Sequence, residues 1–322
     1  MGQRRIGQLG FLDGMLNRRS AGRRDVLHEI DQLLDWSAFE RLLAVIPVAA
    51  KGEPSFPPLM MFKVLLLQRW YGLSDPAMEA ALFDRMSFLR FAGLSLDDAT
   101  PDHSTIWRFR ERLTKDELIA GLFAELARQL DARGLMIKQG TLIDASMVTS
   151  AARRPRKEEG QTSEADPDAR FGADNERHRF TFGYKLHVAV DQWSGLIRNG
   201  LLTSANIQDV SVATALIPPD AGIVYADRGY HSKGLRAHLQ AQGFGDVVMR
   251  RSQKGKPLLP HEIQRNHLIV PLRSPVEAVF GTLKRSYGLS RMRYFNGPRN
   301  LVAYLLACMA FNLRRSVALT TG

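Results

Sequence analysis

Apolar positions recur at helical spacing through the first 135 residues. Between residues 24 and 46 they return every three or four positions, and a second apolar run over 57–71 opens with two prolines. The capping sequences SDP at 74–76 and TPD at 100–102 each mark the start of a further helix. This part of the chain is therefore predicted to be all helical.

From residue 140 the pattern changes to strand-like alternation. A short apolar strand over 140–145 carries Asp144 near its end, and Phe180–Val190 is predicted to form a hairpin with Gly195–Thr203. Further strands are expected at 222–226, which ends on Asp227, and at 246–249, with helices over 209–217, 232–242, 274–287 and 298–315. This order predicts an α/β fold with a mixed five-stranded sheet flanked by helices, as in ribonuclease-H-like proteins.

The change of pattern divides the chain into two predicted domains. An all-helical N-terminal domain over 1–135 precedes a ribonuclease-H-like domain over 136–322. Within the second domain, the stretch 153–179 is dense in charge and poor in apolar residues. We expect this stretch to be a mobile loop that leaves the sheet just after Asp144.

Composition limits the classes of protein that remain. The chain is 45% hydrophobic and 24% charged, so it can bury a core. Its one cysteine, Cys308, excludes a disulfide framework and cysteine-rich zinc sites. The longest apolar runs fall short of the roughly 20 residues that span a bilayer. We therefore expect a cytoplasmic protein with no membrane partner.

The net charge of +11 is confined to the last quarter of the chain. Residues 248–322 hold 13 Lys and Arg but only two acids, Glu262 and Glu277, which gives 13 − 2 = +11. The preceding residues hold 31 basic and 31 acidic side chains and sum to zero. Such a concentration favours a polyanionic partner such as DNA, although a solvated basic surface would give the same count.

Three acids stand out by their positions in the predicted fold. Asp144 and Asp227 end strands that are neighbours in a ribonuclease-H-like sheet, and Glu277 lies on a late helix that could cross the sheet. Carboxylates held together repel one another unless a cation binds, and oxygen ligands suit Mg²⁺ or Mn²⁺. Two such ions, about 3.5–4 Å apart, would support in-line displacement at a DNA phosphate.

The segment around Glu277 adds two cations on the same helix face. Arg273, Glu277, Gly281 and Lys284 follow one another at four, four and three residues. Arg273 and Lys284 would then hold phosphates beside the metal ions. Taken alone, this pattern also fits a surface salt-bridge array on an ordinary helix; the two strand-end aspartates favour the functional interpretation.

Several stretches resemble a known family. TLIDAS, FGYKLHVAVD, TSANIQD, YADRGY and SPVEAVFGTLK resemble the catalytic core of bacterial DDE insertion-sequence transposases, in the broad group of the fourth and fifth families. FPPLMMFKVLLLQRWYGLSD and PDHSTIWRFRERL resemble the helical domain that precedes the core in the fifth family. In that group a Tyr stands three residues before the Arg; here Arg273, Glu277 and Lys284 match, and Val270 takes the place of the Tyr.

The resemblance implies a reaction. The protein would recognise the terminal inverted repeats of a mobile element, free a 3′-hydroxyl at each end and transfer it into target DNA, with Asp144, Asp227 and Glu277 as metal ligands. Two ends must be joined, so we expect at least a homodimer. A nuclease of the same fold and a catalytically silent DNA-binding protein are the alternatives, and the Val270 departure leaves room for the second.

Other residues are candidates for DNA contacts or for the edge of the site. The helix over 103–113 carries Arg108 and Arg110 and could act as a recognition helix, or could be an amphipathic helix whose arginines face water. Arg228 follows Asp227 directly and is a candidate for a phosphate contact. Asp209 begins a predicted helix, either as its cap or as a group near the metal ions; we favour the cap.

Overall fold

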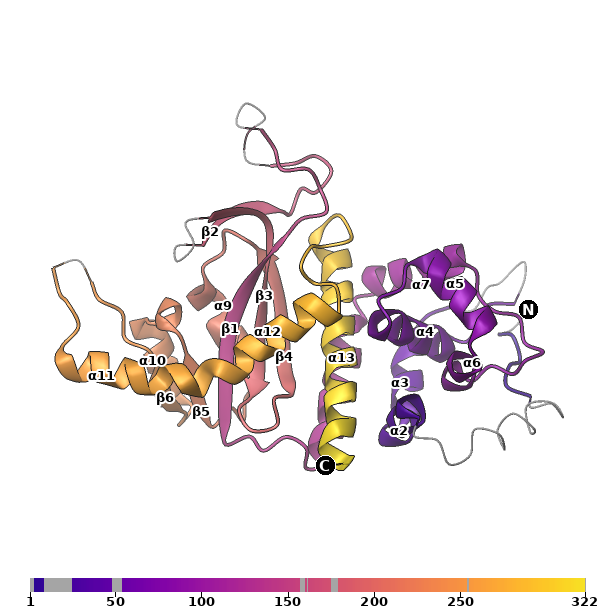
Figure 1. Cartoon of the computed structure of the whole chain (residues 1–322), viewed down its shortest axis with the longest axis horizontal. Coiled ribbons are helices and arrows are strands. Elements are labelled where there is room, and N and C mark those ends of the chain that lie inside the picture. Colours follow the sequence, from indigo (N-terminus) through magenta and orange to yellow (C-terminus); the bar gives the residue numbers. More distant parts are fainter. Residues whose placement is uncertain are drawn as a thin grey trace. The chain divides into compact units, whose positions relative to one another are not determined.

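The computed structural model describes residues 3–8, 25–47, 54–156, 160, 162–174, 179–253 and 255–321 (Figure 1). The chain forms two compact units. The first comprises residues 1–129 and 305–322, and the second comprises residues 130–304. Each unit has its own hydrophobic core and is described by itself.

The first unit is helical, as predicted. Its helices are α2 (Val26–Leu33), α3 (Trp36–Leu43), α4 (Pro58–Trp70), α5 (Asp75–Asp84), α6 (Met86–Ala92), α7 (His103–Lys115) and most of α8 (Ile119–Ala132). Four of these helices have a side-chain N-cap. The side chains of Asp25, Asp35, Ser74 and Asp102 accept hydrogen bonds from backbone amides in the first turns of α2, α3, α5 and α7. Helix α4 is buried on every face from Met60 to Arg69, so it forms the centre of this unit.

The second unit contains a mixed six-stranded sheet. Its strands are β1 (Gly140–Thr149), β2 (Arg170–Asp174), β3 (Arg179–Asp191), β4 (Ile197–Ser204), β5 (Ile223–Ala226) and β6 (Gly245–Val248). The order is β2-β3-β1-β5-β6, with β4 also pairing with β3. Pairs among β1 to β4 are antiparallel, and β1-β5 and β5-β6 are parallel. This is the ribonuclease-H-like arrangement, with one strand more than predicted.

The additional strand comes from the charged stretch 153–179, and the expectation of a mobile loop is wrong for much of it. Strand β2 pairs with the start of β3. Asp166 is fully buried, where it accepts hydrogen bonds from the Ser150 and Tyr184 hydroxyls and from the amide of Asn296. A buried acid anchored by three donors fixes this part of the stretch to the sheet. Residues 157–159, 161 and 175–178 lie outside the described residues.

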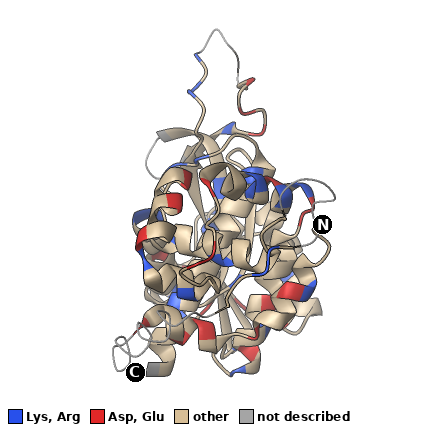
Figure 2. Ribbon diagram, turned by 90° about the vertical axis from the view of Figure 1, so that its right-hand side faces the viewer, with Lys and Arg blue, Asp and Glu red and all other residues tan. Residues whose placement is uncertain are grey.

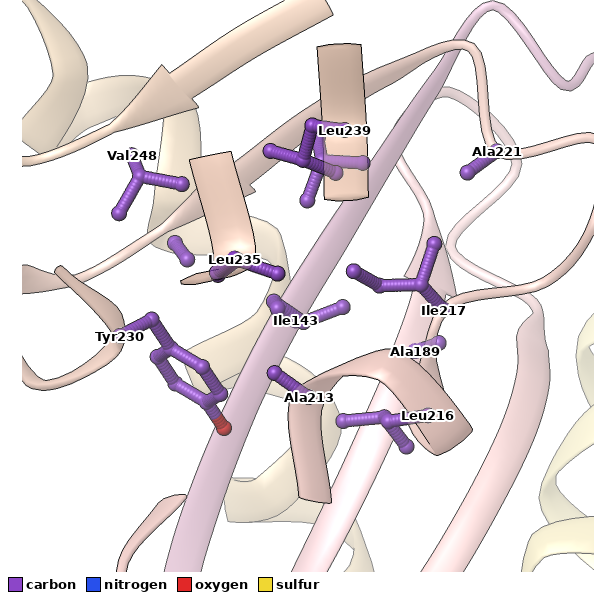
Figure 3. Close-up of a cluster of buried hydrophobic side chains, with 12 residues drawn as sticks. Ile143, Ala189, Ala213, Leu216, Ile217, Ala221, Tyr230, Leu235, Leu239 and Val248 are labelled. Atoms are coloured by element: carbon purple, nitrogen blue, oxygen red, sulfur yellow. The ribbon is translucent and has the colours of Figure 1, made fainter. Parts of the chain in front are cut away.

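Helices cover both faces of this sheet. Helices α9 (Asp209–Leu216) and α10 (Lys233–Ala241) pack on one face around a cluster that includes Ile143, Ala189 and Leu239 (Figure 3). Helix α12 (Ser274–Ser286) crosses β1 on the other face (Figure 1). The first and fourth strands of the predicted fold, β1 and β5, are neighbours as expected.

Helix α11 (Pro260–Ile269) was not predicted, and it covers the edge of the sheet at β6. The guanidinium of Arg265 donates to the carbonyls of Asp246 and Val248, at 3.0 and 2.8 Å. The Asn266 side chain pairs with both backbone groups of Arg250. These side chains satisfy carbonyls that another strand would otherwise pair with, so the edge ends here.

The last helix changes the predicted domain boundary. Helix α13 (Gly297–Thr321) supplies residues 305–321 to the first unit, where the indole of Trp70 donates to the carbonyl of Ala310 at 2.7 Å. The predicted division at 135/136 placed this helix wholly in the second domain. Helix α13 is long and apolar enough to cross a membrane, but 72% of that stretch is buried within the protein, as in a core helix.

The expectation that Arg110 contacts DNA is wrong. It is 2% exposed and donates to both carboxylate oxygens of Asp75 and to Gln68, which joins α7 to α5 and α4. A guanidinium committed to a buried ion pair cannot reach DNA, so Arg110 is a structural residue. Arg108, two positions away on α7, is exposed.

These two arginines form a matched pair for a stability measurement. We expect Arg110→Met to lower the free energy of unfolding by about 3–5 kcal/mol, because it leaves Asp75 partly buried without its counter-ion. Arg108→Met should change it by less than about 0.5 kcal/mol. Urea denaturation followed by circular dichroism measures both; equal stabilities of the two variants would contradict the structural role of Arg110.

Candidate active site

The parallel pairing of β1 with β5 brings two of the predicted acids to the same level. Leu142 lies opposite Tyr225, so Asp144 is in register with Asp227 two residues further on. Strand β5 ends at Ala226, while β1 continues to Thr149. From Asp144 onward, β1 therefore has no strand beside it on the β5 side. Polar side chains can reach β1 there.

Asp144 is a mostly buried carboxylate held by one arginine. Its Oδ2 lies 3.1 Å from the guanidinium of Arg273, and its side chain is 17% exposed. Burial raises the pKa of Asp144 from 3.8 to about 7; Arg273 acts to lower it, and the charges of Asp227 and Asp209 raise it further. The site thus holds more negative charge than one guanidinium neutralises.

Asp227 shapes the turn that follows β5. Its carboxylate accepts a hydrogen bond from the amide of Gly229 at 2.9 Å and caps a single 3₁₀ turn, η2 (Arg228–Tyr230). This cap fixes the direction in which the chain leaves the strand. Arg228 is exposed beside Asp227, where a DNA phosphate could approach it.

Glu277, the third predicted acid, is not gathered with the other two. It lies in the first turn of α12 and is exposed. Within the part of the chain that the structure describes, no three His, Cys, Asp or Glu side chains are close enough to hold a metal ion. The sequence predicted the helix that carries Glu277 but could not show how its carboxylate lies relative to the two aspartates.

The two cations that flank Glu277 both contact β1. Arg273 ends the short helix η3 (Val270–Arg273) and pairs with Asp144, and Lys284 donates to the carbonyl of Met147 at 2.9 Å. Both basic side chains therefore reach β1, whereas Glu277, between them in the sequence, is exposed. Val270, at the position of the family Tyr, is 53% exposed.

Three polar residues on the α9 side of β1 were not assigned to the site from the sequence. Asp209 is the first residue of α9, whose cap is Gln208, so the prediction that Asp209 is the cap is wrong. The Nζ atom of Lys185 lies 2.8 Å from Oδ1 of Asp209. Tyr230 is fully buried, and burial together with the charges of Asp144, Asp209 and Asp227 raises the pKa of its hydroxyl well above the ordinary value. The motif YADRGY, with Tyr230 three residues after Asp227, was the available signal.

The first unit offers a separate candidate surface on α7. Arg108 is exposed, and its guanidinium donates to the hydroxyls of Ser104 and Thr105 at 3.1 and 3.0 Å. Trp107, next to it, is 49% exposed. Basic and acidic residues are interleaved in the view of Figure 2, in keeping with the balanced charge of the chain before residue 248. The candidate surface is thus a local one, formed by the first two turns of α7.

Comparison with known proteins gives the family. Residues 15–112 match the family described as "Transposase domain (DUF772)", and residues 136–313, more than half of the chain, match "Transposase DDE domain". A solved structure, the piggyBac transposase synaptic complex with hairpin DNA determined by cryo-EM, aligns over 95% of this chain and 78% of that chain, with 10% identity and a TM-score of 0.45. The chain belongs to the DDE transposase family and is a DNA transposase of the insertion-sequence type.

Proposed function

We propose that this transposase cuts phosphodiester bonds at the terminal inverted repeats of its element and transfers the 3′-hydroxyl ends into target DNA. Asp144, Asp227 and Glu277 are the proposed catalytic residues. The observation that carries the assignment is the buried carboxylate of Asp144, with a pKa raised to about 7, in register with Asp227 at the end of β5. Such a pair is unfavourable without a cation.

The residues present suit a divalent metal ion. Members of this family use divalent ions, and carboxylate oxygens suit Mg²⁺ and Mn²⁺. Asp144 and Asp227 would hold the metal, with Glu277 completing the ligand set from α12. Two Mg²⁺ or Mn²⁺ ions bound there would activate the attacking oxygen and stabilise the leaving oxygen. Arg273 neutralises part of the charge on Asp144 when no metal is bound.

The basic residues around the acids have proposed roles in holding DNA. Arg228 is exposed next to Asp227, and Lys284 lies on the α12 face that meets β1. We assign both a contact with phosphates near the scissile bond, and Arg273 would join them once a metal ion replaces it at Asp144. These contacts would fix the register of the DNA and leave recognition of its sequence to other residues.

The first unit is the proposed reader of the element ends. Helix α7 presents Trp107 and Arg108 to solvent, and it starts with Ser104 and Thr105, which can bond to bases or phosphates. Two ends must be joined, so the active complex is proposed to be a homodimer or larger, in the cytoplasm. Membership of the fifth insertion-sequence family is part of the same proposal.

Cleavage of a labelled duplex that carries the element end tests the site. We expect nicking at the element boundary with Mg²⁺ and none with EDTA. Asp227→Asn should lower the rate by at least about 100-fold while DNA binding survives, because it removes a metal ligand and not a DNA contact. Asp246→Asn is the matched control, since Asp246 pairs with Arg250 at 3.2 Å on β6 and is expected to retain wild-type cleavage.

Either part of this expectation can fail. A wild-type protein that binds the end but neither nicks nor joins it with any divalent ion would favour the silent DNA-binding protein. Nicking without joining to target DNA would favour a nuclease of the same fold. Wild-type rates for Asp227→Asn would exclude Asp227 from the site.

The pKa of Asp144 predicts a pH-dependent stability. A carboxyl that titrates near pH 7 when folded and near 3.8 when unfolded binds more protons in the folded state, so its contribution to stability falls as the pH rises from about 4 to 7. The Asp144→Asn variant has no carboxyl to ionise at this position, so it lacks this fall in stability with rising pH. In EDTA at pH 8 we expect the variant to melt several degrees above wild type, since about 1 kcal/mol shifts the Tm by roughly 2–4 °C, and at pH 4 the difference should vanish.

Thermal melts followed by circular dichroism provide the measurement. Added Mg²⁺ at pH 8 should raise the Tm of wild type and leave Asp144→Asn unchanged, because binding to the folded state alone stabilises it. A variant less stable than wild type in EDTA at pH 8 would show that the buried charge carries no net cost.

The salt dependence of DNA binding tests the role of Arg108. Removing a basic side chain that neutralises one DNA phosphate reduces the slope of log K against log salt by about 0.9. We expect Arg108→Met to weaken binding to the element end and to reduce the slope by about that amount if it binds one phosphate. Fluorescence anisotropy at several salt concentrations measures both quantities. Unchanged affinity and slope would remove Arg108 from the interface.

A further inference from the structure

Asp209 lies at the point where helix α9 meets the two central strands. It is the first residue of α9, which packs on β1 and β3. Lys185 of β3 holds its Oδ1 at 2.8 Å and also donates to the carbonyl of Ile207 at 2.8 Å. The carboxylate is therefore fixed in place by a lysine that is itself fixed by the backbone, with a side-chain exposure of 27%.

Register places Asp209 beside the end of β1 that carries Asp144. Lys185, which holds Asp209, lies opposite Met147 of β1, three residues beyond Asp144. Side chains alternate along a strand, so Lys185 and Met147 lie on the face where Ile143 packs under α9, whereas Asp144 pairs with Arg273 on the other face. Asp209 thus approaches β1 from the α9 side, while Glu277 is exposed on α12.

Two buried polar atoms on the α9 side of β1 lack a partner among the described residues, and a third, Nε of Arg273, lies at Asp144 on the other side. The hydroxyl of Tyr230 is one of the two; its ring packs in the apolar cluster (Figure 3). Nδ1 of His187 is the other; its Nε2 bonds to the Thr203 hydroxyl at 2.9 Å, and His187 lies opposite Ala145, on the same face as Lys185. Both residues are 0% exposed. Buried polar atoms without partners are rare, and these two lie on the side of β1 that Asp209 approaches, which points to a ligand with its water shell.

We propose that Asp209 is a further carboxylate of the divalent-cation site, which approaches from the α9 face of the sheet while Glu277 approaches from the α12 face. Lys185 is its positioning residue. Tyr230 and His187 lie on the same side and would bond to water carried by a bound cation. This inference rests on the proposed cation site at Asp144 and Asp227.

A titration with Mn²⁺ tests the inference without DNA or turnover. The full chain is titrated, and the free ion is followed by its electron paramagnetic resonance signal. We expect Asp209→Asn to weaken the tightest Mn²⁺ site by at least about tenfold. Asp209→Glu, which keeps the charge, should recover part of the affinity. Asp246→Asn, which removes an ion-paired carboxylate of similar exposure (21%) on β6, should stay within about twofold of wild type.

A purely structural Lys185–Asp209 pair would give a different result. If Asp209→Asn binds Mn²⁺ like wild type while Asp144→Asn does not, the inference is overturned and the proposed function stands. If wild type binds no Mn²⁺, or Asp144→Asn binds it as well as wild type, both are overturned. A cooperative metal-free melt shows that each variant is folded, and Asp209→Ser takes the place of Asp209→Asn should the latter fail that test.

Discussion

The parallel pairing of β1 with a shorter β5 is the constraint on which the site depends. Because β5 stops at Ala226, the chain turns away at Asp227 and leaves one side of β1 open from Asp144 onward. The ladder ends at Leu142 and Tyr225, and both aspartates follow two residues later, so the parallel pairing brings them to the same level. The fold therefore places two acids at one end of the β1–β5 pair despite their repulsion.

That repulsion explains how the neighbouring groups are arranged. A single guanidinium, from Arg273, pairs with Asp144, yet burial and two nearby acids still raise the pKa of that carboxyl to about 7. One positive charge is insufficient, whereas a dication would supply twice as much at a shorter distance. Arg273 and Glu277 lie four residues apart, at the junction of η3 and α12, so the group that neutralises Asp144 and the remaining acid belong to one continuous helical segment.

Most of the sheet and two of the three acids could be placed from the sequence, because strand alternation and strand-end aspartates are local signals. Strand β2 was missed because it is only five residues long and lies in a charge-dense stretch, and its pairing with β3 is not visible in the local sequence. Arg110 was misassigned because the partner that buries it, Asp75, is 35 residues away. Asp209 was predicted to be a helix cap because its ion-pair partner, Lys185, lies 24 residues earlier in the chain, beyond the reach of a local sequence pattern. Long-range pairing of polar side chains is what a single sequence does not show.

Polar side chains also decide where the sheet ends. Strand β6 is the edge strand of the sheet, and its free carbonyls could pair with a strand of another chain. The guanidinium of Arg265 bonds to two of these carbonyls, and the Asn266 side chain pairs with the backbone of Arg250 just beyond the strand. An open edge of this kind can pair with a strand of another chain, and the side chains of α11 prevent this at β6. The basic residues of the last quarter thus differ in their roles: Arg265 is bonded to the backbone of β6, whereas Arg273 neutralises Asp144 as long as no metal ion is bound there.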